Sequence, residues 1–421
     1  MSNKKITAPK GTHDILPESM HIWDYIETTM KDACKNYNYH EIRFPVFENT
    51  ELFNRGVGDT TDVVQKEMYT FNDKGGRSIT LRPEGTASTV RSYLENNLYA
   101  NPAPEKLFYK ITCYRYERPQ AGRFREFNQF GVENFGSNSP YTDAEVISLA
   151  MHLLTSVGVK GLKLYINSIG CPDCRNKYNE LLKNYLVENQ DSLCELCKDR
   201  MYRNPLRVLD CKSPECQVIL KNAPTVDVVL CDDCKNHFND LQNALTSIGI
   251  DFSVDTGLVR GLDYYTKTVF EIKSDDLGAQ ATVCGGGRYD GLIEQLGGDR
   301  TPGIGFSIGL ERLVNILTAQ NIEIPDNNKI TLYIGCIGDK AEKFAFAAAT
   351  ALRKNGISAE FDHMQRSVKA QMKYANKIKA EYTVIIGDDE IDNNVCNLKN
   401  MQNGEQSQVA TSDLLGGILN V

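Results

Sequence analysis

The sequence has 421 residues and a mass of 47.2 kDa, a length that allows two to four domains of ordinary size. Hydrophobic residues make up 41% and charged residues 24%, as in globular proteins, and the net charge of −8 excludes a uniformly basic nucleic-acid coat protein. The chain has no apolar run near the about 18 residues of a membrane span and no secretion signal among its first residues, so we expect a cytoplasmic protein without membrane contact.

The first segments of the chain predict an alternation of helices and short strands. Apolar residues recur at helical spacing over 21–37, which predicts a helix. The following segment, 41–47, is predicted as a strand, and Pro45 places it at a sheet edge or a bend. A strand over 77–83 leads through Glu84 into a helix that ends near residue 96. Two interpretations of Glu84 stay open, a contact with the helix dipole and a ligand-binding carboxylate.

A long hairpin is predicted from two alternating segments, 106–117 and 125–133, and from the Pro119 and Gly122 between them. Alternation places Arg115 and Glu117 on one face of the first strand. On the second strand the residues of one face are Arg125, Phe127, Gln129, Gly131 and Glu133. Buried charges need partners, so this face is either a solvated surface with cross-strand ion pairs or the floor of a site for a charged small molecule.

Residues 167–240 differ in character and are predicted to form an insertion, because eight of the 13 cysteines lie there. The eight form the pairs Cys171/Cys174, Cys194/Cys197, Cys211/Cys216 and Cys231/Cys234. Such spacing is typical of tetrahedral zinc with thiolate ligands, and eight thiols suffice for two structural sites. Unliganded thiols are the alternative, and a reducing cytosol disfavours disulfides. The spacing leaves open whether the pairs combine in order or nested.

After the insertion the strand patterns return, over 252–258, 264–272, 280–284 and 303–308, and a helix is predicted over 310–317. A linker is predicted at 324–328. Beyond it strands and helices alternate, which predicts a small α/β domain with a mostly parallel sheet.

Two segments, 284–290 and 303–312, are glycine-rich, and the second suits a nucleotide or phosphate. The second leads from a strand into a helix with Arg312 in its first turn, an arrangement that suits a phosphate. Arg260 beside Gly261 similarly puts a cation on a tight turn. The sequence has neither a Walker loop nor a dinucleotide-binding loop, so any ATP site must be of another kind.

Taken together, these segments resemble the histidyl-tRNA synthetase family of class II aminoacyl-tRNA synthetases. The resemblance rests on 10–14, 81–86, 114–119, 257–265 and 303–312, which occur in the expected order, and most specifically on Arg260-Gly261-Leu262-Asp263-Tyr264-Tyr265. It covers the whole chain and implies an α+β fold, with an antiparallel-sheet catalytic domain, a helical Cys-rich insertion and a C-terminal α/β anticodon-binding domain. The implied boundaries are 1–166 and 241–323 for the catalytic domain, 167–240 for the insertion, 324–328 for the linker and 329–421 for the last domain.

The resemblance implies ATP-dependent activation of L-histidine to histidyl-adenylate, with Mg²⁺, and transfer to tRNA(His) with release of AMP and pyrophosphate. The helix over 21–37 and the strand after it look like motif 1, which implies a homodimer. A non-catalytic regulatory paralogue of histidine biosynthesis is the alternative, disfavoured by the retained Arg115, Arg260 and Arg312 and by the C-terminal domain. A synthetase for another amino acid is disfavoured by 260–265.

Roles for individual residues follow from the same resemblance. Arg115 and Arg260 are expected to be catalytic, at the α-phosphate. The residues implied for histidine binding are Glu84, Gly85, Thr86, Arg115, Gln129, Glu133, Arg260, Tyr264, Tyr265 and Tyr289. Those implied for ATP are Arg115, Glu117, Arg123 and Arg312, and those for the tRNA acceptor end are Arg118, Gln120 and Arg125. In the last domain, Lys369, Lys373 and Lys377 share one helix face and form either a solvated stripe or a contact with the anticodon stem.

Overall fold

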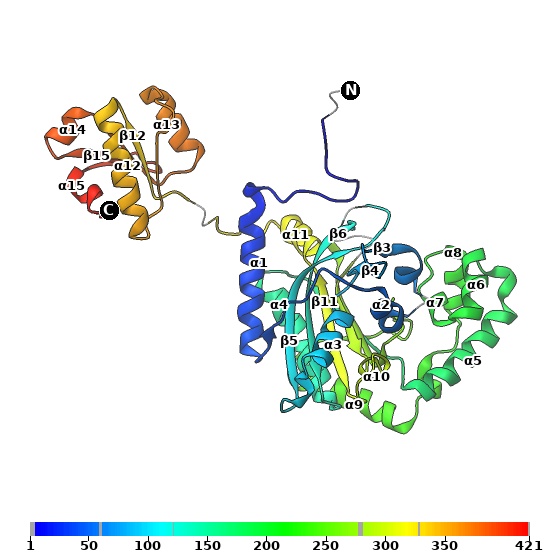
Figure 1. Ribbon diagram of the computed structural model, residues 1–421. Coiled ribbons are helices and arrows are strands. Elements are labelled where there is room, and N and C mark those ends of the chain that lie inside the picture. The colour runs from blue at the N-terminus through cyan, green and yellow to red at the C-terminus, as the bar shows by residue number, and fades with distance from the viewer. Residues whose placement is uncertain (1–4, 59–60, 121, 277–280, 327–328, 420–421) are drawn as a thin grey trace. The chain divides into compact units, whose positions relative to one another are not determined.

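A computed structural model describes residues 5–58, 61–120, 122–276, 281–326 and 329–419. These residues form two compact units, one ending at Ile324 and one beginning at Pro325 (Figure 1). The division between the units falls within the predicted linker. Among the described residues, no helix has the length and apolar character needed to cross a membrane.

The first unit is built on an eight-stranded sheet in the order β1-β5-β6-β11-β10-β9-β7-β8. Its long strands from β5 to β7 pair antiparallel, and the two short edge strands pair parallel with their neighbours. The strands are β1 His40–Glu41, β5 Glu105–Tyr114, β6 Glu126–Phe135, β7 Leu162–Ser168, β8 Ser253–Val254, β9 Thr266–Ser274, β10 Thr282–Arg288 and β11 Gly303–Gly309. The α+β class and its antiparallel sheet are thereby confirmed.

Helices cover one face of this sheet, and their apolar side chains pack against it. They are α1 Pro17–Asn36, α4 Pro140–Ser156, α9 Asp232–Ser247 and α11 Leu310–Ala319 (Figure 1). Ile26 of α1, Ile147 of α4 and Leu313 of α11 are fully buried in the same core as Phe270 of β9. Because apolar packing occupies this face, polar side chains of the strands are left to face the other side.

Smaller elements lie beside the large sheet. They are α2 Thr50–Val57, the π-helix η1 Val63–Glu67, α3 Thr86–Glu95, the 3₁₀ helix η2 Leu98–Ala100, α10 Leu292–Gln295 and a three-stranded sheet of β2 Phe47–Asn49, β4 Ser78–Leu81 and β3 Tyr69–Asn72. The hairpin, the helix over 21–37 and the strand–helix pair around Glu84 were predicted at the right places.

Two predicted strands are wrong. The strand over 41–47 is instead two short strands, β1 and β2, that belong to different sheets. Pro45 lies in the irregular stretch between them, where its missing N–H costs no ladder hydrogen bond. The strand over 252–258 shrinks to β8, because a turn follows in which the Leu258 N–H donates to Asp255 O at 2.9 Å.

The insertion forms a group of helices with a core of its own (green in Figure 1). Its elements are α5 Pro172–Glu188, the 3₁₀ helix η3 Gln190–Ser192, α6 Glu195–Arg203, α7 Leu206–Leu209, α8 Pro214–Leu220 and the 3₁₀ helix η4 Val226–Val229. Helix α9 runs across the implied boundary at 240: Cys234 near its start belongs to the insertion core, and Leu241 and Leu245 near its end belong to the core of the sheet.

The second unit is a five-stranded sheet in the order β13-β12-β14-β15-β16. Its strands are β12 Leu332–Cys336, β13 Ala359–Phe361, β14 Tyr382–Ile386, β15 Cys396–Asn400 and β16 Gln406–Val409. Its helices are α12 Asp339–Lys354, α13 Val368–Lys377, α14 Asp388–Asp392 and α15 Thr411–Leu415. The prediction of a mostly parallel sheet holds for β13–β12 and β12–β14, which pair parallel, and fails for β14–β15 and β15–β16, which pair antiparallel. The short, largely exposed β16 was missed because it has no alternation of apolar residues.

Candidate active site

A cleft of about 370 Å³ opens on the polar face of the large sheet. Its walls come from the β5–β6 connection, β6, the segment 260–265, β10 and the β11–α11 junction. These segments lie far apart in the sequence, and the antiparallel pairing of β6 with β11 and of β11 with β10 brings them together.

Four predicted arginines line this cleft: Arg115, Arg123, Arg260 and Arg312. Arg115 Nε donates to Pro83 O at 2.8 Å, which fixes the guanidinium beside the turn that carries Glu84. Arg312 Nη1 donates to Thr282 O at 2.8 Å. Burial, with a contribution from neighbouring Arg123, lowers the pKa of Arg312. Buried positive charge of this kind is stabilised by an anionic ligand.

Arg260 is held by two features of the strands beneath it. Its guanidinium forms an ion pair with Glu271 of β9. It also lies directly over Gly285 of β10, where any Cβ atom would overlap the guanidinium. The glycine-rich run 284–288 is therefore an ordinary strand whose missing side chain leaves room for the arginine.

A second group of polar and aromatic residues lies at another part of the same cleft. Glu84 accepts hydrogen bonds from Thr86 N at 2.7 Å and Ala87 N at 2.8 Å, so it satisfies the first turn of α3. It lines the cleft as well, and burial raises its pKa. The contact with the start of α3 is therefore present, and ligand binding by Glu84 stays a prediction. The other predicted histidine-binding residues that line the cleft are Thr86, Gln129, Tyr264, Tyr265 and Tyr289.

Two of the residues predicted for histidine binding, Glu133 and Gly85, are not among the lining residues. Glu133 is buried behind it and accepts hydrogen bonds from the hydroxyls of Tyr109, at 3.0 Å, and Tyr289. Burial raises the pKa of Glu133 to about 8. Gly85 packs against the ring of Tyr109, which leaves no room for a side chain there. Tyr109 itself was missed, because alternation alone does not indicate a buried hydroxyl.

The β5–β6 connection holds the residues predicted for ATP and tRNA. Glu117 and Arg123 line the cleft and form an ion pair at 3.1 Å. The tRNA candidates Arg118, Gln120 and Arg125 are not among the lining residues. Arg118 and Gln120 are exposed, and Arg125 stacks on Tyr116, 3.8 Å from the ring centre.

Sequence reasoning gave no role to Glu67, Arg207 or Glu311, which also line the cleft. Glu311 accepts hydrogen bonds from Asn128 N at 2.7 Å and Asn128 Nδ2 at 3.0 Å. The position of Glu311 next to Arg312, at the start of a helix, could have indicated from the sequence that it lines the cleft. Arg207 comes from α7 of the insertion, and no pattern in the sequence places that helix beside the cleft.

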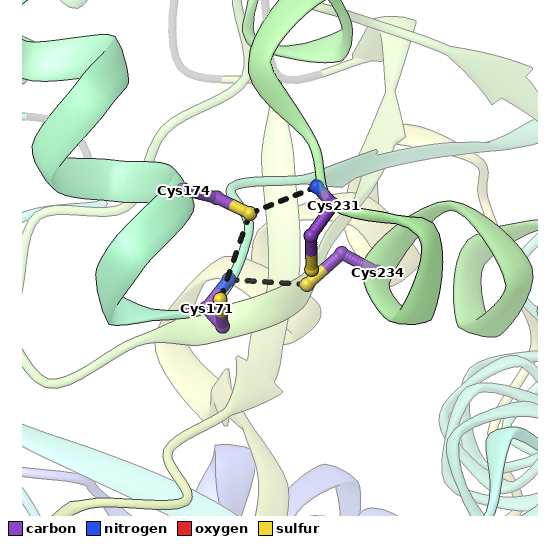
Figure 2. A group of neighbouring side chains, drawn as sticks. All are labelled: Cys171, Cys174, Cys231 and Cys234. Carbon is purple, nitrogen blue, oxygen red and sulfur yellow. Dashed lines mark hydrogen bonds between the residues drawn. The ribbon is translucent and has the colours of Figure 1, made fainter.

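The eight predicted cysteines gather in two groups. Cys171, Cys174, Cys231 and Cys234 form one of them (Figure 2), and Cys194, Cys197, Cys211 and Cys216 form the other. The first and last pairs of the sequence therefore meet, and the two inner pairs meet.

Comparisons with known proteins agree with this architecture. A sequence model described as histidyl-tRNA synthetase matches residues 11–313, and one described as anticodon binding domain matches residues 331–420. A synthetase domain followed by an anticodon-binding domain defines the class of the aminoacyl-tRNA synthetases.

Similar proteins are close in sequence over nearly their whole length. Histidine–tRNA ligase of Acetivibrio thermocellus is 56% identical over 97% of this chain and 98% of its own length, and that of Clostridioides difficile is 53% identical over 97% of both. Apo histidyl-tRNA synthetase of S. aureus is 41% identical, covers 98% of this chain and 99% of its own, and superposes with a TM-score of 0.84. The chain therefore belongs to the histidyl-tRNA synthetase family.

Proposed function

We propose that this chain activates L-histidine with ATP and then transfers the histidyl group to tRNA(His). The observation that carries the proposal is the meeting of Arg115, Arg260 and Arg312 in one cleft whose other lining includes Glu84 and three tyrosines. Arginine suits phosphate and carboxylate, and a carboxylate with hydroxyls suits an amino acid that bears an amine and an imidazole.

In the first step the histidine carboxylate attacks the α-phosphorus of ATP, the bond to the β-phosphate oxygen breaks, and pyrophosphate leaves. Positioning and positive charge supply most of the catalysis of such a transfer. We assign this charge to Arg115 and Arg260, and we assign Glu117, Arg123 and Arg312 to the rest of the nucleotide. In the second step a terminal ribose hydroxyl of the tRNA attacks the histidyl carbonyl and AMP leaves.

Mg²⁺ suits this site, because Glu117 and Glu311 supply carboxylate oxygens in the cleft, the ligand type that Mg²⁺ takes together with phosphate oxygens. When bound, the ion neutralises charge on the β- and γ-phosphates.

Histidine selection is assigned to the other part of the cleft. Glu84, Thr86 and Gln129 hold the α-amino group, and Tyr264, Tyr265 and Tyr289 surround the imidazole. Glu133 acts from behind Tyr289 through the hydroxyl that it binds. A smaller apolar amino acid leaves these buried polar groups unpaired, which costs roughly 1–3 kcal/mol for each group.

Contacts with tRNA are assigned to side chains of both units. Arg118, Gln120 and Arg125 lie in the β5–β6 connection at the cleft, and Lys369, Lys373 and Lys377 are exposed along α13. Pairing of two chains through α1 and β1, and a cytoplasmic location, stay predictions.

Exchange of pyrophosphate into ATP, measured with each of the common amino acids, tests the proposal. We expect exchange with histidine only, before any tRNA is added. Exchange with a different amino acid contradicts the specificity, and no exchange at all favours the regulatory paralogue.

The variant Arg260→Ala makes the same experiment specific for the site. It should slow histidine-dependent exchange by a factor of about 100 or more, because it removes a charge at the reacting phosphate. Arg77→Ala is the matched control, since Arg77 is exposed and pairs only with Asp73 in a surface turn among the contacts described. Equal rates in the two variants contradict the role of Arg260.

A further inference from the structure

The two cysteine groups of the insertion are arranged like metal sites. In each group the four sulfur atoms all lie within 4.8 Å of one another. Sulfur atoms at the corners of a tetrahedron around zinc are about 3.8 Å apart, given a Zn–S bond of about 2.3 Å. The separations Cys171 Sγ–Cys174 Sγ, 3.5 Å, and Cys194 Sγ–Cys211 Sγ, 3.8 Å, match this value.

Backbone N–H groups point at the sulfur atoms in both groups. In the first group the contacts are reciprocal, with Cys171 N 3.3 Å from Cys234 Sγ and Cys231 N 3.1 Å from Cys174 Sγ (Figure 2). In the second group Cys194 N donates to Cys216 Sγ at 3.3 Å and Ser213 N to Cys211 Sγ at 3.4 Å. Thiolates accept such bonds, which orient metal ligands and offset their negative charge.

Helix starts also converge on the two groups. Cys171, Cys194 and Cys231 are the N-cap residues of α5, α6 and α9, and the second cysteine of each of these pairs lies in the first turn. Cys216 lies in the first turn of α8. The positive ends of two helices therefore face each group, which favours thiolates over thiols.

The insertion has few apolar residues with which to stabilise itself. Five of the 13 buried residues of its core are cysteines of these groups. Small domains with so little apolar packing often depend on a structural metal. A catalytic role is not indicated, because the ligand set is all cysteine and leaves no open position for a substrate.

We propose that the insertion binds two structural zinc ions, one held by Cys171, Cys174, Cys231 and Cys234 and the other by Cys194, Cys197, Cys211 and Cys216. The pairing is nested. The first ion joins the segment that leaves β7 to the start of α9, so it closes the neck of the insertion. The second ion lies inside the insertion and holds α6 and α8 together.

The second ion also has a consequence for the cleft. The segment from α6 to α7 reaches 260–265 through two contacts, in which Asn204 Nδ2 donates to Asp263 Oδ1 at 3.0 Å and Arg207 Nη2 donates to Gly261 O at 2.7 Å. A third contact joins Arg200 of α6 to Asp62 of the cleft lining, at 3.0 Å. Loss of this metal should therefore loosen the insertion side of the active site.

Metal analysis of the full-length protein, purified without chelator, tests the first part of the proposal. We expect about two zinc ions per chain, with X-ray absorption showing four sulfur ligands at about 2.3 Å. The control Cys336→Ser in the second unit should bind the same amount. Less than about one zinc ion per chain, or a shell with nitrogen or oxygen ligands, overturns the proposal.

The pairing is tested on the unaltered protein by partial removal of zinc, alkylation of the cysteines that become reactive, and peptide mapping. Nested pairing predicts that Cys171, Cys174, Cys231 and Cys234 become reactive as one set and the other four as a second set. If Cys171 and Cys174 become reactive together with Cys194 and Cys197, the nested pairing is overturned.

Variants give an independent check of the pairing. Replacing all four cysteines of the first group by serine should leave about one zinc ion per chain. Replacing Cys171, Cys174, Cys194 and Cys197 damages both nested sites and should leave none. The reverse result overturns the pairing.

Discussion

Glu133 is a carboxyl group enclosed by two tyrosine hydroxyls and shielded from water. Its pKa is raised to about 8 by burial, so the folded chain binds this proton more tightly than the unfolded chain does. The associated stability is fully present below the ordinary pKa of glutamate and is lost as the pH rises through about 8.

The variant Glu133→Gln should remove this pH dependence, because the amide does not ionise. Between pH 5 and pH 9 the melting temperature of the unaltered protein should fall further than that of the variant, since each unit of pKa shift is worth about 1.4 kcal/mol. Thermal unfolding at the two pH values measures the difference. Glu126→Gln, on the exposed side of the same strand, is the control. If the melting temperatures of the two variants depend on pH in the same way, Glu133 is not the source of the effect.

At the scale of single residues, the sequence predicted four of the five arginines and all three tyrosines that line the cleft. Alternation along the hairpin placed Gln129 and Glu133 on one face, and the structure puts Gln129 in the cleft and Glu133 one layer behind it. That difference was beyond the sequence, because it depends on Tyr109, a residue of the neighbouring strand that fills the space between Gly85 and Gly131.

At the scale of elements, helix α7 brings a cation from the insertion to a cleft built on the sheet. Arg207 lines the cleft and is anchored to Gly261 O. Its Nε atom is buried and has no hydrogen-bond partner. We expect that this side chain contributes to ligand binding rather than to the chemical step.

The variant Arg207→Ala should raise the KM for ATP or histidine roughly tenfold and leave kcat nearly unchanged, because a charge-assisted contact is worth about 1.5–3 kcal/mol. Steady-state exchange kinetics measure both constants. Arg203→Ala is the control, since Arg203 is exposed on α6 and pairs with Asp199. A fall in kcat with KM unchanged would contradict a binding role.

Elements with strong periodicity were predictable and weakly patterned ones were not. The hairpin β5–β6 and helix α1 follow from alternation and helical spacing. The segment 41–47 has the composition of a strand, but its two ends belong to different sheets, on either side of Pro45. Composition does not show which strand each end pairs with. The cysteine spacing indicated metal sites but not the nested grouping. That grouping depends on the fold, which brings the start of α9 next to Cys171 and Cys174.

At the scale of the whole molecule, the net charge of −8 hides local positive charge. Lys369, Lys373 and Lys377 lie exposed at i, i+4 and i+8 on α13 of the second unit, whereas the arginines of the cleft belong to the first. The first step of the proposed reaction therefore draws on the first unit, and the second step draws also on tRNA contacts assigned to both units.

Replacing these three lysines by alanine should weaken binding of tRNA(His) and flatten its dependence on salt, because fewer counterions are released. Histidine-dependent pyrophosphate exchange should be unchanged. Filter binding at several salt concentrations, together with exchange, measures both. The control replaces Lys340, Lys343 and Lys354 of α12, and an equal loss of tRNA binding in the control would leave α13 with no special role.

Helix α9 also limits which segment of this chain can be transplanted into a related protein as the insertion. Its first turn carries Cys234 of the first cysteine group, and its last turns are packed in the core of the sheet. Between them His237 Nε2 lies 2.8 Å from the buried Asp143 of α4. An insertion cut out at its compositional edge would take away part of the catalytic core. The natural unit for transplantation runs from the end of β7 through Cys234, which keeps the four cysteines of the first group together and leaves the later turns of α9 to the host.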